Sequence, residues 1–317
     1  LITDDVNIAA KFLREGKLVA FPTETVYGLG ADALNPDAVA SVFAAKGRPA
    51  DNPVIVHIAD AKDIDRVAEN ASENVAIFMK AFFPGPCTLV VKKKKNIPAI
   101  VSAGLSTVGV RIPDHEVARS LIRLSGCLVA APSANLSGRP SPTTFQAVRD
   151  DMDGRVDCIL RGDPSRIGLE STVVDCTVDP PVVLRPGGVS LEELRQVVPT
   201  TVSHTDAPDE SLIRSPGTIH PHYQPRAIVR LVDRGEVADS YLDDMSTCGY
   251  IGLHMPAGAF AGASICLCNS PEAYAHSIFD FFRQCDRAGI KTIYCERVPE
   301  KGVGVALMDR LSRAAKR

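Results

Sequence analysis

Apolar residues in the first two thirds of the chain alternate between helical and strand spacing. Residues 4–15 repeat apolar side chains at helical spacing and end at Gly16, and residues 17–21 then have strand character. Another helix is predicted to begin at Asn35-Pro36, an N-cap followed by a first-turn proline. Strands are also predicted at 54–58, 88–91, 108–112, 127–131, 156–160, 171–174 and 182–184, and helices at 114–124, 143–151 and 190–198. This alternation is typical of an α/β domain with a large mixed sheet.

The pattern stops near residue 199 and restarts near residue 227. Thr, Ser, Asp, His and Pro accumulate between these points, as they do in linkers. The restarted pattern predicts strands at 227–232, 249–254, 263–267 and 291–295, and helices at 271–287 and 304–315. Their order predicts a smaller, Rossmann-like domain with a parallel sheet. We therefore expect a first domain at 1–200, a linker at 201–226 and a second domain at 227–317.

Composition narrows the class of protein. With 317 residues and 45% hydrophobic content, the chain is long enough for two domains with buried cores. A net charge of -3 argues against a protein that coats nucleic acid. The sequence has no apolar run of about 18 residues and no basic-then-apolar leader, so we expect a cytoplasmic protein without a membrane partner.

Cysteine usage agrees with a reducing compartment. Nine cysteines are an odd number, and most lie within apolar runs, so we expect reduced thiols in the core. Cys266 and Cys268 are two residues apart but lack a matching second pair, so the spacing does not predict zinc.

The segment from Phe21 to Gly30, followed by 46–53, has the composition of an anion-binding site. We expect a strand that runs into a hydroxyl- and glycine-rich turn, then a helix that ends at Gly47. Lys46 and Arg48 would project from the loop beyond that helix. A planar guanidinium beside a compact ammonium suits a polyphosphate.

Two other interpretations of this segment stay open. The spacing Gly28-x-Gly30-x-x-Ala33 resembles a dinucleotide-binding fingerprint, with Asp51 at a suitable distance for a ribose contact, but helix breakers surround Asp51. Lys46 and its neighbouring arginine could also be a solvated surface pair, although the flanking glycine and prolines favour a rigid loop.

Polar residues also occur at the ends of several predicted strands. Alternation along the strand places Thr107, Gly109 and Arg111 on one face. Arg111 could be an ion-pair partner or a carboxylate clamp. His57 could contact a ligand or be a half-buried histidine that bonds a backbone carbonyl.

The segments 130–138, 170–174 and 184–187 repeat this arrangement. Small and hydroxylated residues at 130–138 form either a simple turn or a place where a ligand approaches the backbone closely. The lysines at 92–95 are expected to be a solvated strand exit instead of an RNA-binding patch.

Together these motifs resemble the YrdC-type domain of L-threonylcarbamoyladenylate synthases. The residues that carry the resemblance are Phe21–Gly30, Lys46–Pro53, Pro84–Thr88, Ser133–Asn135, Glu170–Thr172 and Arg185–Gly187, in the family's order. The second part is similar to the linker and C-terminal domain of the long form, through Ser215–Gly217, His222, Tyr223, Pro225 and the segment 302–311.

The resemblance implies a twisted, mixed-sheet YrdC-like fold followed by the Rossmann-like domain. It implies a nucleotidyltransferase that joins L-threonine, bicarbonate and ATP into threonylcarbamoyl-AMP and releases pyrophosphate. The product would serve tRNA processing, at the adenosine beside the anticodon, through downstream tRNA threonylcarbamoyl-transfer proteins. Direct tRNA binding stays open.

The resemblance also implies roles for single residues. Lys46 and Arg48 would be catalytic, stabilising charge at the α-phosphate, and Mg²⁺ would arrive with ATP without ligands from the protein. ATP-binding residues would be Lys46, Arg48, Asn52, Thr107, Ser133, Asn135, Ser141, Arg185 and, as a lid from the linker, Tyr223. L-threonine would be held by Thr23, His57, Arg111, Ala131 through its backbone, and Ser171.

The chain departs from the family's pattern at one place, and two rival functions stay open. Family linkers carry a basic and an aromatic residue where this chain has Thr218–Pro221, which puts a cationic linker contact in doubt. A double-stranded-RNA or nucleotide binding module without turnover would show RNA affinity with a steep salt dependence. A nicotinamide-dependent enzyme would show its nucleotide preference in a thermal-shift screen.

Overall fold

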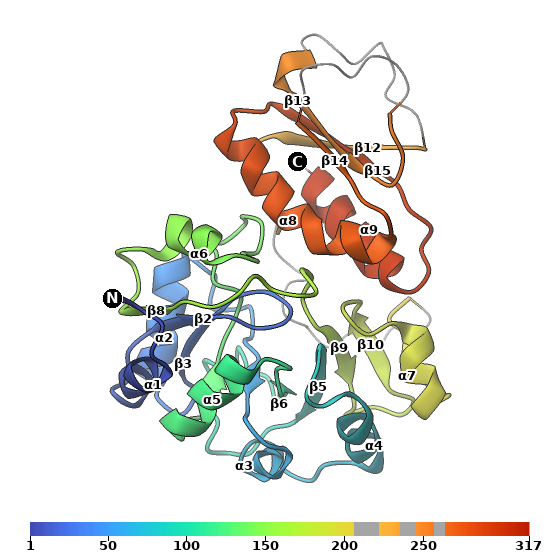
Figure 1. Ribbon diagram of the computed structural model, residues 1–317. Coiled ribbons are helices and arrows are strands. Elements are labelled where there is room, and N and C mark those ends of the chain that lie inside the picture. Colours follow the sequence, from blue (N-terminus) through green and yellow to red (C-terminus); the bar gives the residue numbers. More distant parts are fainter. Residues whose placement is uncertain (206–221, 235–244, 257–263, 317) are drawn as a thin grey trace.

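The computed structural model describes residues 1–205, 222–234, 245–256 and 264–316. They form an eleven-stranded mixed sheet and a separate four-stranded sheet (Figure 1). The smaller sheet is parallel in every pairing that the structure describes. The expected large mixed sheet and small parallel sheet are therefore confirmed.

The first sheet has the strand order β1-β8-β2-β3-β7-β4-β6-β5-β9-β10-β11. Its strands are β1 (Ile2–Thr3), β2 (Val19–Phe21), β3 (Gly28–Asp32), β4 (Val56–His57), β5 (Cys87–Lys92), β6 (Thr107–Arg111), β7 (Val129–Ala130), β8 (Cys158–Leu160), β9 (Thr172–Asp175), β10 (Val182–Arg185) and β11 (Val202–Ser203). The helices between them are α1 (Val6–Arg14), α2 (Pro36–Lys46), α3 (Ile64–Val67), α4 (Glu73–Phe82), α5 (Glu116–Ser125), α6 (Phe145–Met152) and α7 (Leu191–Val197).

The glycine-rich segment forms a strand where the sequence predicted a turn. Gly28 and Gly30 lie in β3, antiparallel to β2, and a Cβ on either would come within 3.1 Å of the Phe21 ring. These glycines therefore make room for an aromatic ring in the core. A dinucleotide fingerprint needs glycines in a turn that opens a helix, so that interpretation is wrong.

The helix that follows has the ends that the sequence predicted. The Asn35 side chain accepts hydrogen bonds from the backbone N–H groups of Asp37 and Ala38, and Pro36 occupies the first turn. Gly47 ends α2 in the left-handed conformation, with φ 63°. This glycine turns the chain so that Arg48 leaves the helix axis.

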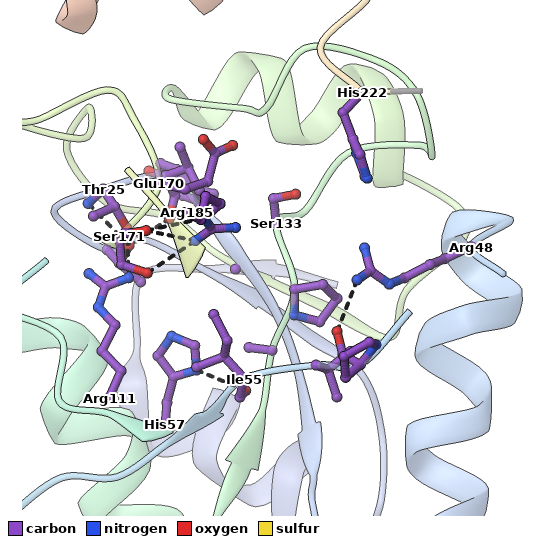
Figure 2. Close-up of a pocket in the computed structure, with 18 of the residues that line it drawn as sticks. Thr25, Arg48, Ile55, His57, Arg111, Ser133, Glu170, Ser171, Arg185 and His222 are labelled. Atoms are coloured by element: carbon purple, nitrogen blue, oxygen red, sulfur yellow. Dashed lines mark hydrogen bonds between the residues drawn. The ribbon is translucent and has the colours of Figure 1, made fainter. Parts of the chain in front are cut away.

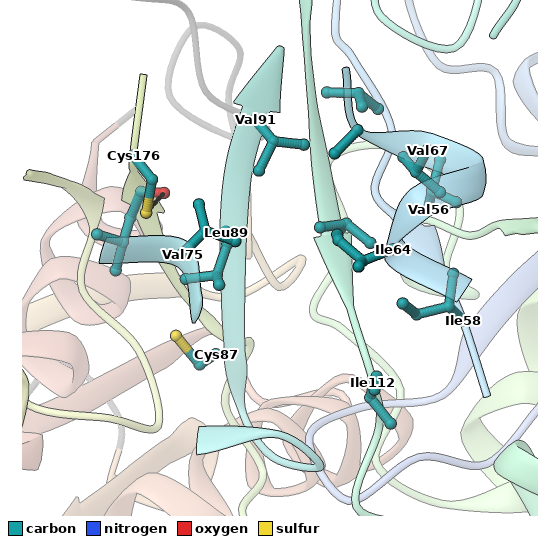
Figure 3. Close-up of a cluster of buried hydrophobic side chains, with 14 of the residues drawn as sticks. Val56, Ile58, Ile64, Val67, Val75, Cys87, Leu89, Val91, Ile112 and Cys176 are labelled. Atoms are coloured by element: carbon teal, nitrogen blue, oxygen red, sulfur yellow. Dashed lines mark hydrogen bonds between the residues drawn. The ribbon is translucent and has the colours of Figure 1, made fainter. Parts of the chain in front are cut away.

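Apolar packing fixes the strands that carry the predicted polar residues. Figure 3 shows Cys87, Leu89 and Val91 spaced along one face of β5, with Ile64 and Val67 of α3 across β6. A side chain on the other face of such a strand is held in a fixed direction.

The second domain comprises β12 (Ile228–Val232), β13 (Cys248–Gly252), β14 (Ser264–Leu267), α8 (Pro271–Arg287), β15 (Thr292–Glu296) and α9 (Val303–Ala315), with strand order β12-β15-β13-β14. Helices α8 and α9 lie between this sheet and the first domain (Figure 1). Most of the predicted linker, including Ser215–Gly217 and Thr218–Pro221, falls outside the described residues. Strand β11 extends the first sheet to Ser203.

None of the described helices is long and apolar enough to cross a membrane. The cysteines of the chain are present as free thiols, and seven of the nine are buried.

Candidate active site

A pocket in the first domain collects polar residues from strands and loops far apart in the chain. The predicted site residues that line it are Thr23, Arg48, His57, Arg111, Ala131, Ser133, Ser171, Arg185 and Tyr223. Figure 2 shows Arg48 and His222 on one side and Arg111, Ser171 and Thr25 on the other, with Ser133 between them.

Lys46 lies behind the pocket wall and is 3% exposed. Its ammonium donates hydrogen bonds to the backbone carbonyls of Ser133 and Asn135, the latter at 2.5 Å. The expectation that Lys46 projects from the loop is therefore wrong, because it is the last residue of α2 and points inward. Burial holds the pKa of the Lys46 ammonium well below its ordinary value, and the nearby Arg48 charge lowers it further.

Arg48 enters the pocket from the loop after α2. Its Nε donates to the Asn52 carbonyl at 3.3 Å and its Nη2 to the Pro53 carbonyl at 3.0 Å. Burial lowers the pKa of Arg48 to about 10, so the guanidinium stays charged at neutral pH. Asn52 thus supports Arg48 through its backbone and is itself buried.

Ser133 and Asn135 continue the same side of the site. Ser133 Oγ donates to Asn135 Oδ1 at 2.6 Å, and Asn135 Nδ2 donates to the carbonyls of Leu136 and Arg139. This network orients the two carbonyls that hold Lys46.

The opposite side of the pocket centres on Arg111, which is 4% exposed. Its Nη2 lies 2.5 Å from Glu24 Oε1, its Nη1 donates to Thr25 Oγ1 at 2.9 Å and its Nε to the Gly85 carbonyl at 3.1 Å. Glu24 is 1% exposed, so this is a buried ion pair. A ligand carboxylate would have to share Arg111 with Glu24.

His57 packs edge-on against the Phe21 ring and lines the pocket. Its Nδ1 lies 3.3 Å from the Ile55 carbonyl, the contact expected for a strand histidine. Burial, followed by the Arg111 charge, lowers the pKa of His57 to about 3. The imidazole is therefore neutral at physiological pH.

Arg185, the last residue of β10, bonds Ser171, the residue directly before strand β9. Its Nη2 donates to the Ser171 carbonyl at 2.8 Å and to Ser171 Oγ at 3.2 Å, and Thr88 Oγ1 lies 2.8 Å from that hydroxyl. Ser141 reaches the same wall by donating to Glu170 Oε1 at 2.6 Å.

Thr23, Ala131 and Thr107 are the remaining predicted site residues, and the first two of them line the pocket. Thr23 is buried and donates to the Val26 carbonyl at 2.6 Å. The Ala131 amide donates to the Ile55 carbonyl. Thr107 pairs with Lys92 at the other end of β6 from Arg111, about 13 Å along the strand, and is not among the residues that line the pocket.

The carboxylates of the site did not follow from the sequence. Glu24 lies within Phe21–Gly30 and Glu170 begins the segment Glu170–Thr172. A buried arginine predicts a nearby acid. Which arginine pairs with which carboxylate, however, depends on the tertiary fold. Glu170 Oε2 contacts Arg310 of α9 at 2.9 Å. Burial alone would raise the pKa of Glu170, but Arg310 and Arg185 hold it below its ordinary value.

Linker residues close the pocket. His222 and Tyr223 line it, and Tyr223 has φ 67°, a left-handed conformation that a bulky residue adopts only when its surroundings enforce it. The remaining cavity is about 70 Å³, well below the ~300–1,000 Å³ of small-molecule pockets. A nucleotide could enter only if these residues shifted.

Two family models match adjacent parts of the chain. One, described as telomere recombination (Sua5_yciO_yrdC), matches residues 11–187, and the other, threonylcarbamoyl-AMP synthase, C-terminal domain, matches residues 189–316. The threonylcarbamoyl-AMP synthase of Pyrococcus abyssi is 44% identical, over 98% of this chain and 94% of the relative. That of Bacillus subtilis is 42% identical, over 99% and 94%. The chain belongs to the threonylcarbamoyl-AMP synthase family.

Solved structures agree with membership of this family. A crystal structure of P. abyssi Sua5 complexed with L-threonine matches with a TM-score of 0.90 and 42% identity, over 98% of this chain and 94% of that chain. The structure of E. coli YciO, with a TM-score of 0.51 and 24% identity, covers 59% of this chain and 93% of its own, and supports the fold alone.

Proposed function

We propose that this protein is a threonylcarbamoyl-AMP synthase, which makes threonylcarbamoyl-AMP and pyrophosphate from L-threonine, bicarbonate and ATP. The observation that carries the proposal is a single pocket with Arg48, free of a described ion pair, on one side, Lys46 behind that wall, and the ion pair of Arg111 and Glu24 on the other side. The family membership supports the same reaction.

The cationic side would bind ATP. Arg48 is bonded to uncharged carbonyls, so its charge remains available to phosphate oxygens, and Lys46 would support this side from behind the wall. Ser133, Asn135, Ser141 and Arg185 complete this side, with Asn52 supporting Arg48 and Tyr223 covering the nucleotide. Thr107, which lies at the far end of β6, would contribute only if ATP extends to that end of the strand.

The ion-paired side would bind L-threonine. Arg111 would share its guanidinium between Glu24 and the threonine carboxylate, while Thr23, His57, the Ala131 backbone and Ser171 surround the amino-acid side chain.

The reaction can proceed by positioning and electrostatic stabilisation. The threonine amine and bicarbonate condense to a carbamate with loss of water. A carbamate oxygen then attacks the α-phosphorus, the bond between that phosphorus and the bridging oxygen breaks, and pyrophosphate leaves with the electron pair. Lys46 and Arg48 would stabilise the negative charge that shifts in this step.

Mg²⁺ would accompany ATP. Glu170, a carboxylate that lines the pocket, already accepts from Ser141 and pairs with Arg310, so its oxygens are engaged. Magnesium commonly keeps most of its waters and binds through substrate phosphates, which fits a site without a protein cage.

The product would pass to downstream transfer proteins that modify the adenosine beside the tRNA anticodon, in the cytoplasm. The proposed catalytic domain spans residues 1–200, the linker 201–226 and the C-terminal domain 227–317.

Pyrophosphate release tests the proposal. Purified protein is incubated with ATP and Mg²⁺, with and without L-threonine and with and without bicarbonate. We expect release only when both are present, together with a threonylcarbamoyl-AMP mass. Pyrophosphate release at the same rate without threonine, or no release under any condition, would contradict the proposed function.

A further inference from the structure

Among the residues that the structure describes, Arg310 is the most deeply buried cation that the second domain places against the first. It lies on α9 and is 0% exposed. Its Nε contacts Glu170 Oε2 at 2.9 Å across the domain boundary, and its Nη1 contacts Asp309 Oδ2 at 2.7 Å. Its guanidinium also lies over the Tyr223 ring, with the carbon 5.4 Å from the ring centre. One side chain thus joins the catalytic domain, the linker and the C-terminal domain.

A contribution to the stability of the fold does not by itself explain why an arginine is buried at position 310. A fully buried arginine loses its hydration, and Arg310 Nη2 has no hydrogen-bond partner among the described residues. Apolar side chains often replace buried ion pairs without loss of stability. A buried arginine in this position therefore points to a role at the pocket that its partners Glu170 and Tyr223 line.

Glu170 gives the reason. This carboxylate lines the pocket together with Arg48 and Arg185, and its other oxygen accepts from Ser141. An unneutralised carboxylate here would repel a phosphate group. Arg310 supplies an opposite charge from behind the wall, in addition to that of Arg185.

Tyr223 is held by the same helix pair. Its ring stacks on Phe279 of α8, with centroids 5.3 Å apart, and Arg310 lies close to the ring as well. The left-handed backbone at Tyr223 therefore has two anchors in the second domain.

We propose that Arg310 is a positioning residue through which the C-terminal domain completes the ATP side of the site, by neutralising Glu170 and seating Tyr223. This inference rests on the proposed function for the identity of its ligand. The second domain is then part of the binding apparatus, and its contribution is a charge placed behind the pocket wall.

A second buried arginine provides the matched control. Arg283 of α8 pairs with Asp151 of α6 at 2.8 Å and also crosses the domain boundary. Asp151 does not line the pocket. Arg139 also pairs with Asp151, at 2.7 Å, so loss of Arg283 should weaken docking of the domains without leaving this carboxylate, which acts on Lys46, unpaired.

The test measures ATP affinity by isothermal titration without threonine, so that no turnover is needed. The proteins are wild type, Arg310→Met, Arg310→Met with Glu170→Gln, and Arg283→Met, each checked by thermal unfolding. We expect Arg310→Met to weaken ATP binding at least tenfold, the double variant to recover to within about threefold of wild type, and Arg283→Met to stay within about threefold. Arg310→Gln replaces Arg310→Met if the latter does not fold.

Three results would overturn the inference: unchanged ATP affinity in the neutral Arg310 variant, an equal loss in Arg283→Met, or no recovery in the double variant. Wild-type pyrophosphate release is measured in parallel. Its absence would contradict the proposed function alone, because the ATP affinities would still decide the role of Arg310.

Discussion

The two sides of the pocket use arginine and lysine in opposite ways. Lys46 and Arg48 are hydrogen-bonded to backbone carbonyls, and neither forms an ion pair with a described carboxylate. Arg111 is held against Glu24 at 2.5 Å. Lys46 and Arg111 are buried and Arg48 is half-buried, yet the positive charge of Arg48 is not paired with a described carboxylate, whereas Arg111 and Glu24 are neutral as a pair.

This difference in charge predicts which of the proposed substrates binds on each side of the pocket. A triphosphate carries several negative charges and gains most from cations that nothing else neutralises. An amino acid carries one charge of each sign, and an ion pair offers each of them an opposite partner. The charge state of each side thus predicts which substrate it receives, independently of any residue-by-residue correspondence with relatives.

The largest expected effect comes from removing the amino group of Lys46. Lys46→Met should lower kcat/KM for ATP by on the order of a hundredfold or more, by analogy with the loss of one preorganised donor. It should also lower the stability by roughly 1–3 kcal/mol, because the carbonyls of Ser133 and Asn135 lose their donor. Pyrophosphate release and thermal unfolding measure the two effects.

Lys95→Met, at an exposed lysine, is the control and should change neither quantity. Near-normal turnover in Lys46→Met would remove Lys46 from the site.

Arg111 allows the binding role to be separated from the structural one. Arg111→Met should leave the buried Glu24 unpaired and cost about 3–5 kcal/mol of stability, while raising the threonine KM at least tenfold. Adding Glu24→Leu should restore stability without restoring the threonine KM. Steady-state kinetics and chemical unfolding of the two variants provide the measurements.

The ATP KM should move far less in these variants. Equal rises in both KM values would show that Arg111 is only structural and that the two sides are not separate.

The sequence predicted the parts of this site that depend on local signals. The α2 caps at Asn35 and Gly47 and the strands that carry His57, Arg111 and Arg185 follow from spacing and from residue type. The strand at Gly28 could not be predicted as readily, because its glycines are explained by the size of the Phe21 ring, a tertiary contact.

The sequence could not predict the partners of the charged residues either. Whether Lys46 faces solvent or two carbonyls, and whether an arginine meets a carboxylate, depends on elements up to 140 residues apart, as in the pair of Arg310 and Glu170. The contribution of the second domain to the pocket is therefore visible only in the folded chain.

A smaller effect is expected on the pH dependence of the stability, through His57 on the threonine side of the pocket. The pKa of His57 is about 3 in the folded protein, below its value of about 6.5 in an unfolded chain. Between these values the unfolded chain binds the extra proton, so the stability that this histidine contributes is present above pH 6.5 and is lost as the pH falls toward 3.

His57→Asn should therefore flatten the stability profile between pH 6.5 and pH 4, which urea unfolding at a series of pH values measures. A profile with the wild-type slope would mean that another group causes the acid sensitivity.

The smallest expected effect tests the threonine side with a substrate change. Serine lacks one methyl group, a loss of about 1 kcal/mol, and should lower kcat/KM about fivefold with the ATP KM unchanged. Analogues without the hydroxyl or the carboxylate should be rejected more strongly, because polar groups of the pocket would lose their partners. Competition between threonine and each analogue in the pyrophosphate assay gives the ratios. If alanine competes as well as serine, the pocket does not bond the hydroxyl, and the ion pair alone selects the substrate.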